Sequence, residues 1–341
     1  MDQQDSLQQV LEAADKRRAE RREFFRYASG FGIAAAGAAV LSACGSDDDD
    51  DDSGTVTVTA TATPTPTPTP TPSATITVTE ADILNFALNL EYLEAQFYSF
   101  AANGTGLAAG LLSGTGTAGA ATGGRQVTFT DPLVARYARE IAADEQGHVA
   151  FLRRTLGTAA IAQPAIDLSP AATGAFAAAA VAAGLIETGQ PFDPYASDEN
   201  FLLAAFLFED VGVSAYKGAI GYLATTSYID ATAGIQAAEA YHAGLIRTVL
   251  YRKGVDTPSL VEASEKISTA RDTLDGSGDI DQGVKMVNGA SNIVPSDGTG
   301  IAFARSPYQV LNIAYLTNAA ATKGGFFPNG VNGVVNSSVA T

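Results

Sequence analysis

Two histidines occur in this chain of 341 residues, and each lies three residues after a glutamate. The first pair is Glu145 and His148, and the second is Glu239 and His242. On an α-helix, residues three apart project from one face, so both side chains of a pair can reach the same metal ion. The repeated Glu-x-x-His spacing therefore predicts two arms of one metal centre.

An internal repeat supplies two further glutamates. The segment NLEYLEAQFY, which contains Glu91, aligns with LFEDVGVSAY, which contains Glu209. Each glutamate lies in an apolar stretch, where burying an unpaired carboxylate would be costly. Four carboxylates and two imidazoles suit a pair of iron or manganese ions, because carboxylate oxygens can bridge two ions. We therefore predict a dinuclear site with these six ligands: Glu91, Glu145, His148, Glu209, Glu239 and His242.

A tyrosine follows each repeated glutamate by seven residues, at Tyr98 and Tyr216. This spacing predicts that both tyrosines lie near the metal centre. Their hydroxyls could donate hydrogen bonds to ligating carboxylates or relay electrons. Core packing with a satisfied hydroxyl is the alternative for both.

The repeat also separates ligands from neighbouring acids. Glu94 shares a helical face with Glu91 but aligns with Gly212, so we expect Glu94 outside the ligand set, either behind a ligand or facing solvent. Glu140 precedes Glu145 by five residues, which is about 140° around a helix, and it cannot join the same centre.

Four charged residues beside the predicted ligands are expected to have other partners. Asp144 and Asp210 each neighbour a ligand and should point into solvent or form salt bridges. Arg153 and Arg247 recur five residues after the histidines. We expect both arginines to pair with carboxylates at the surface or near the ligands.

Four long segments with helical periodicity must position these residues: 79–103, 130–157, 197–223 and 230–254. About 40 residues separate the second from the third and contain a short Ala-rich helix at 170–187. That connection can cross a bundle from end to end, whereas the third and fourth segments are joined closely. The sequence thus predicts an all-α four-helix bundle with a long crossover between its second and third helices.

Residues 1–43 are typical of a targeting segment. RREFFR at 21–26 has a twin-arginine pattern, an apolar stretch follows at 27–43, and LSAC ends at Cys44. This resembles a bacterial Tat lipoprotein signal peptide, which implies lipidation of Cys44. An uncleaved membrane anchor is the alternative, although 17 residues fall short of the roughly 20 that span a bilayer. Cys44 is the chain's one cysteine, which excludes an intramolecular disulfide.

The rest of the chain divides into three predicted parts. Residues 44–78 form an acidic, Thr/Pro-rich disordered linker, in which six aspartates precede a TPTPTP tract. Residues 79–256 form the bundle. Residues 257–341 form a C-terminal extension packed on it, with helical signals at 259–273 and 308–321. The net charge of −17 argues against nucleic-acid binding, which needs a basic surface.

Residues 80 to about 330 resemble a known family. LNFALNLEYLEAQFY, EIAADEQGHVAFL, FEDVGVSAYKG and GGFFPNGVNG are similar to the ferritin-like superfamily, specifically its exported bacterial branch related to desiccation-associated proteins. The resemblance implies a ferritin-like fold for the bundle. Members of this branch keep the ligand set to different extents, and this chain has all six positions.

These observations lead to two functional hypotheses. The first is an exported protein, anchored to the bacterial cell envelope through a lipid on Cys44, whose two iron or manganese ions react with oxygen or peroxide as in a ferroxidase, peroxidase or catalase. The second is a non-catalytic lipoprotein that protects against stress or desiccation, in which the six residues could also form a metal-free polar network. A closed iron-storage shell conflicts with a lipid tether on every subunit. The sequence is compatible with a homo-oligomer other than a closed shell.

Overall fold

A computed structural model describes residues 78–276 and 278–341. The predicted signal peptide, the lipidation site Cys44 and the linker up to residue 77 lie outside the described residues. Among the described helices, none is long and apolar enough to cross a membrane.

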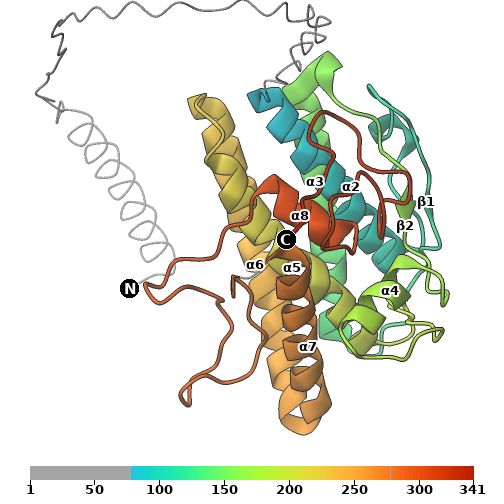
Figure 1. The fold of residues 1–341 in the computed structure, drawn as a ribbon. Coiled ribbons are helices and arrows are strands. Elements are labelled where there is room, and N and C mark those ends of the chain that lie inside the picture. The colour runs from blue at the N-terminus through green and yellow to red at the C-terminus, as the bar shows by residue number, and fades with distance from the viewer. Residues whose placement is uncertain (1–77, 277) are drawn as a thin grey trace, which may run out of the picture. The chain divides into compact units, whose positions relative to one another are not determined.

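Four long helices form the centre of the fold (Figure 1). Helix α2 (Glu80–Asn103) packs along α3 (Pro132–Leu156), and α5 (Asp198–Ile220) packs along α6 (Thr226–Asp256). The two hairpins meet where α2 lies against α5 and α3 lies against α6. The prediction of an all-α bundle is confirmed.

Residues that favour helix ends fix the ends of α2 and the start of α3. Thr79 and Asp82 form a reciprocal capping box at the start of α2, and Gly104 closes that helix with a φ of 76°. The Asp131 carboxylate accepts a hydrogen bond from the Leu133 backbone at the start of α3. The sequence signals for these ends are therefore correct.

Helix α6 begins at Thr226, four residues before the predicted start, because another helix caps it. The Glu80 carboxylate of α2 accepts a hydrogen bond from the Thr225 backbone nitrogen at 2.7 Å and bonds the Thr225 hydroxyl at 2.6 Å. These bonds lower the pKa of Glu80 from its usual range, the contact with the Thr225 hydroxyl most. A cap from a distant segment leaves no local signal in the sequence.

The long crossover spans residues 157–197 and contains α4 (Ala175–Ala182), which is shorter than the predicted 170–187. Two short strands, β1 (Ala121–Thr122) and β2 (Ile166–Asp167), pair in parallel and join the α2–α3 loop to the crossover. Single-turn 3₁₀ helices lie at η1 (Ala109–Leu111) and η2 (Gly157–Ala159).

The C-terminal extension covers one side of the bundle. Helix α7 (Pro258–Asp275) packs on α5 and α6, and α8 (Pro307–Ala314) packs on α5 and α7. Helix α8 ends seven residues before the predicted 321, and Leu316 just beyond it adopts a left-handed φ of 55°. The final tail returns to α2, where the Asn332 backbone exchanges two hydrogen bonds with the Asn89 side chain at 2.9 and 3.0 Å.

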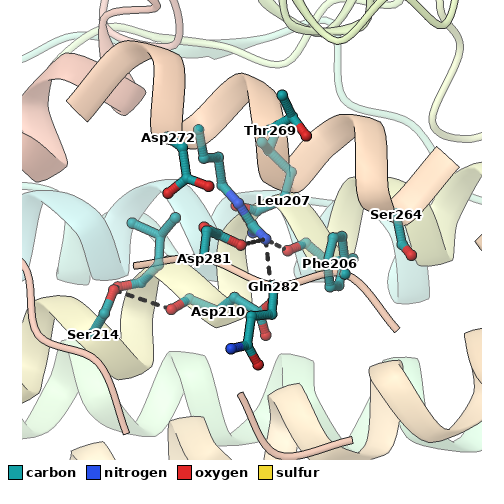
Figure 2. A network of polar contacts seen from close by, with 12 residues as sticks. Phe206, Leu207, Asp210, Ser214, Ser264, Thr269, Asp272, Asp281 and Gln282 are labelled. Carbon is teal, nitrogen blue, oxygen red and sulfur yellow. Dashed lines mark hydrogen bonds and ion pairs between the residues drawn. The ribbon is translucent and has the colours of Figure 1, made fainter. Parts of the chain in front are cut away.

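Buried ion pairs link the extension to the bundle (Figure 2). Arg271 of α7 lies 3.2 Å from the carboxylate of Asp210 in α5 and 2.6 Å from that of Asp281. Arg247 of α6 pairs with the same Asp210 at 2.6 Å, and Arg305 pairs with Asp281 at 2.7 Å. All five side chains are buried, so each charge depends on its partners for solvation.

Candidate metal centre

The four long helices bring all six predicted ligands to one place inside the bundle. Helix α2 contributes Glu91, and helix α5 contributes Glu209. Helices α3 and α6 each contribute a Glu-x-x-His pair. The four glutamates are fully buried or nearly so, and the two imidazole rings lie 6.0 Å apart between their centres.

Four side chains form the first group of potential metal ligands, with one ligand atom from each within 4.8 Å of the others. The Nδ1 atom of His148 lies 3.2 Å from an Oε atom of Glu91, 3.5 Å from Glu145 and 3.6 Å from Glu239. This group joins α2, α3 and α6.

Three side chains form the second group. The Nδ1 atom of His242 lies 3.0 Å from Glu145 and 3.6 Å from Glu209. Glu145 belongs to both groups, with Oε2 facing His148 and Oε1 facing His242. A carboxylate shared in this way is the arrangement that bridges two neighbouring metal ions.

The donor atoms face one another without hydrogen bonds to satisfy them. Both oxygens of Glu145 and of Glu239, and Nδ1 of each histidine, are buried and have no hydrogen-bond partner within the described ranges. Buried polar atoms are rarely left unpartnered, because desolvation costs about 1–3 kcal/mol for each group. A pair of divalent cations would satisfy all these atoms together, and the carboxylate and imidazole donors suit iron or manganese. The residues therefore fit the predicted pair of ions.

Each of the two tyrosines forms a hydrogen bond with a glutamate in the other half of the repeat. The Tyr98 hydroxyl on α2 donates a hydrogen bond to Glu209 on α5, and the Tyr216 hydroxyl on α5 donates one to Glu91 on α2. Each bond uses the carboxylate oxygen that faces away from the histidine. Of the alternatives that the sequence left open, the geometry favours hydrogen bonding to the carboxylates of the predicted ligands.

The charges at the centre depend on one another. Burial lowers the pKa of His148, but the negative charges of Glu91 and Glu145 outweigh it and raise that pKa to about 11. Burial also lowers the pKa of His242, but the negative charges of Glu209 and Glu145 outweigh it and raise that pKa to about 12. Burial raises the pKa of Glu91 to about 7. Burial raises the pKa of Glu145, but the two neighbouring histidines outweigh it and lower that pKa to about 2.

Two acids beside the centre have no counterpart in the repeat, and the structure selects between the alternatives that the sequence left open for them. Glu94 is 5% exposed, so it does not face solvent, and its pKa is raised well above the usual range by burial and by the carboxylates of the centre. Asp144 lies 3.2 Å from Nε2 of His242 and could orient that ring. Gly212 and Ala238 occupy the corresponding positions of the other half, so the repeat gave no signal for either acid.

Of the other charged residues near the predicted ligands, all but Arg153 lie as the sequence predicts. Asp210 forms the predicted salt bridges, and Arg247 pairs with it as expected. Arg153 instead donates to the Tyr92 hydroxyl at 2.6 Å and pairs with no carboxylate in the described part of the chain, which corrects the prediction. Glu140 is exposed on α3, in agreement with its exclusion from the centre.

Comparisons with known proteins agree with this architecture. The ferritin-like domain family matches residues 79–252. The chain is 32% identical over 269 residues to the ferritin-like catalase Nec2 of Nesocodon mauritianus, which covers 74% of this chain and 84% of that protein. It is 30% identical over 266 residues to the desiccation-related protein PCC13-62 of Craterostigma plantagineum, which covers 74% and 83%. No solved structure shows significant similarity. This chain therefore belongs to the ferritin-like domain family.

Proposed function

We propose that this protein holds two iron or manganese ions and uses them to disproportionate hydrogen peroxide. The observation that carries the proposal is the shared carboxylate of Glu145, which belongs to both ligand groups. The name of the relative Nec2, a ferritin-like catalase, supports peroxide as the oxidant. In the overall reaction, one peroxide takes up two electrons and two protons to give two waters. A second peroxide releases two electrons and two protons to give dioxygen.

When bound, the two ions would supply the two-electron exchange between successive peroxide molecules. Glu91, Glu145 and His148, with Glu239, would hold one ion. Glu145, Glu209 and His242 would hold the other.

Other residues of the chain would fix these ligands. Tyr98 and Tyr216 hold the outward oxygens of Glu209 and Glu91 by hydrogen bonds, so each carboxylate presents its other oxygen to the centre. With the proton of the imidazole on Nε2, Asp144 would accept a hydrogen bond from that atom, which leaves Nδ1 free to bind a cation. The four glutamates of the centre are at most 1% exposed, so their carboxylates are shielded from bulk water.

The matched pair Glu145→Gln and Glu140→Gln tests this function. Both substitutions replace a glutamate of α3 by its neutral isostere, but Glu140 is exposed and distant from the centre. We expect the metal-loaded wild type and Glu140→Gln to release one dioxygen for every two peroxides consumed. Glu145→Gln should lose at least a hundredfold in rate. Absence of dioxygen release by a wild type carrying two ions per chain would contradict the proposal.

A second candidate function is protection without catalysis, which the name of the relative PCC13-62 favours. In this case the ions would stabilise the bundle only. The same assay separates the two functions, because a protective protein would bind metal and raise its melting temperature without consuming peroxide.

We also propose that the mature protein is attached to the bacterial cell envelope through Cys44. The twin-arginine segment at 21–26, the apolar stretch at 27–43 and the position of Cys44 directly after that stretch support this proposal.

A further inference from the structure

A small cavity lies between α2, α5 and α8, beside the metal centre. Its volume is about 30 Å³. Three pairs of lining residues correspond in the internal repeat, so the cavity lies where the two halves of the bundle meet. These pairs are Leu90 with Phe208, Leu93 with Val211, and Glu94 with Gly212.

Gly212 connects the cavity to the ligands. A Cβ atom at this position would lie 2.2 Å from Oε2 of Glu239 and 3.3 Å from Oε1 of Glu94. Any larger residue would therefore displace the carboxylate of Glu239 and crowd that of Glu94. The carboxylate of the potential ligand Glu239 therefore packs directly against Gly212, which also lines the cavity.

Helix α8 and the tail close the opposite side of the cavity. Val310, Ile313 and Ala314 of α8 line it, together with Phe326. The wall is apolar except for Glu94, which is the one charged side chain among the lining residues of the described chain.

A second cavity, also of about 30 Å³, shares Leu207 and Ile313 with the first. It extends between α4 and α7 to Ala182, which is exposed, and Phe192, which is half-buried. The two cavities are therefore neighbours, one near the surface and one beside Gly212 and Glu94, and both are lined mostly by Ala, Leu, Ile and Phe.

Size and polarity define what the inner cavity can hold. One water needs about 10–15 Å³, so 30 Å³ accommodates a molecule of about two heavy atoms. Apolar walls disfavour ions, because burying an unpaired charge is costly. A polar molecule in this cavity needs a hydrogen-bonding partner, and the carboxyl of Glu94 is in place to provide one.

We propose that these two cavities admit hydrogen peroxide to the metal centre, and that Glu94 is the positioning residue that hydrogen-bonds it in the inner cavity. This inference rests on the proposed function for the identity of the substrate, whereas the cavities themselves can be tested without metal or activity.

The first test uses xenon as the probe. Xenon binds in small apolar cavities, and crystals of the protein under xenon pressure should show an atom between α2, α5 and α8. Ala314→Leu fills the cavity from α8 and should abolish this site. Ala263→Leu is the matched control, because Ala263 on α7 is equally buried, at 8% against 7% exposure, and lines neither cavity. Xenon absent from the wild-type cavity, or retained in Ala314→Leu, would overturn the proposal.

The second test measures how fast the reduced, metal-loaded protein is oxidised by hydrogen peroxide and, separately, by dioxygen. Glu94→Leu should slow the reaction with peroxide at least tenfold and leave the reaction with dioxygen within twofold, because dioxygen needs no hydrogen bond. Glu94→Gln should restore most of the peroxide rate. Metal content and xenon binding should stay as in the wild type.

Three outcomes of the second test would overturn the inference. Equal slowing with both oxidants would show that Glu94 acts only on the structure of the centre. Slowing with dioxygen alone would assign the cavity to dioxygen. Unchanged rates in Glu94→Leu, together with unchanged rates in Ala314→Leu measured in the same assay, would place the entry route elsewhere. A protein that binds xenon as described but never binds metal would instead contradict the proposed function.

Discussion

At the residue scale, each tyrosine hydroxyl links its own half of the bundle to a predicted ligand in the other half. Tyr98 belongs to the same helix as Glu91 but bonds Glu209, and Tyr216 does the reverse. Groups that hold metal ligands in this way typically contribute a factor of about 10–100 to metal affinity. Because the two bonds are equivalent, their removal should have similar effects.

We therefore predict that Tyr98→Phe and Tyr216→Phe each weaken metal binding by about 10–100-fold, measured by titration with iron or manganese. Tyr92→Phe is the control, because its buried hydroxyl bonds the Leu111 carbonyl and Arg153 instead of the centre. Equal metal affinity in all three variants would show that the tyrosines serve core packing alone.

The buried acids predict how the stability of the metal-free protein depends on pH. Glu91 keeps its proton in the folded protein up to a pKa of about 7, whereas the unfolded chain releases it near 4.5. Between these values the folded state binds more protons, so the free energy of unfolding falls as the pH rises. Glu94, Glu209 and Glu239 also have raised pKa values and act in the same direction.

We expect the metal-free protein to lose about 3 kcal/mol from Glu91 alone between pH 4.5 and 7. The raised pKa values of His148 and His242 extend the loss above pH 6.5, since the folded state still holds their protons there. Metal affinity should change in the opposite direction, because cations compete with protons for the same atoms. Denaturant unfolding at several pH values, with and without metal, measures both trends. Metal-free stability that rises from pH 5 to 7 would contradict this account.

The clustering of the six predicted ligands could be predicted from sequence because the two halves repeat the same spacing. Glu94 and Asp144 could not, because the repeat places Gly212 and Ala238 opposite them. Residues that occur in only one half of a duplicated site are placed by the packing between the halves, here between α2 and α5. Sequence symmetry thus predicts the ligands but misses the residues that distinguish one side of the centre from the other.

At the element scale, buried ion pairs attach α7 and the following loop to the bundle. Asp210 follows the potential ligand Glu209 directly, and Arg247 and Arg271 both hold it. The C-terminal extension therefore helps to fix the position of α5 at the centre.

Removal of one member of this network should be strongly destabilising. Arg271→Leu leaves Asp210 and Asp281 buried with fewer partners, and we predict a loss of about 3–5 kcal/mol in the free energy of unfolding. Arg252→Ala is the control, because that exposed arginine pairs with Asp131 at 3.7 Å and should cost less than about 1 kcal/mol. Chemical denaturation of both variants measures the difference, and equal costs would contradict the role of the network.

Helix boundaries show the limits of local sequence signals in the same way. The start of α2 was predicted correctly, because Thr79 and Asp82 cap each other within one turn. The start of α6 was not, because its cap comes from Glu80, which is 145 residues away in the sequence. The end of α8 depends on the left-handed backbone of Leu316. Leucine rarely adopts this conformation, so the sequence does not predict the turn.

At the scale of the whole molecule, the proposed function combines an internal metal centre with attachment to the cell envelope. A lipid on Cys44 would confine the protein to the membrane surface, and the linker to residue 78 would separate the bundle from it. Peroxide removal would then take place outside the cytoplasm.

We predict that Cys44→Ser moves the protein from the membrane fraction to the soluble fraction of a bacterium that processes lipoproteins. Replacement of both Arg21 and Arg22 by Lys should instead block export and leave an unprocessed precursor. Fractionation and intact-mass measurement distinguish these results. Membrane association that survives Cys44→Ser would favour the uncleaved anchor.

The number of metal ions in each chain tests the central claim most directly. Elemental analysis of the purified protein after reconstitution should give about two iron or manganese ions per chain. The double variant His148→Ala and His242→Ala should bind close to none while its circular dichroism still shows a helical protein, and Glu140→Gln should keep both ions. A wild-type value near zero, or an unchanged metal content in the double variant, would contradict the assignment of this centre.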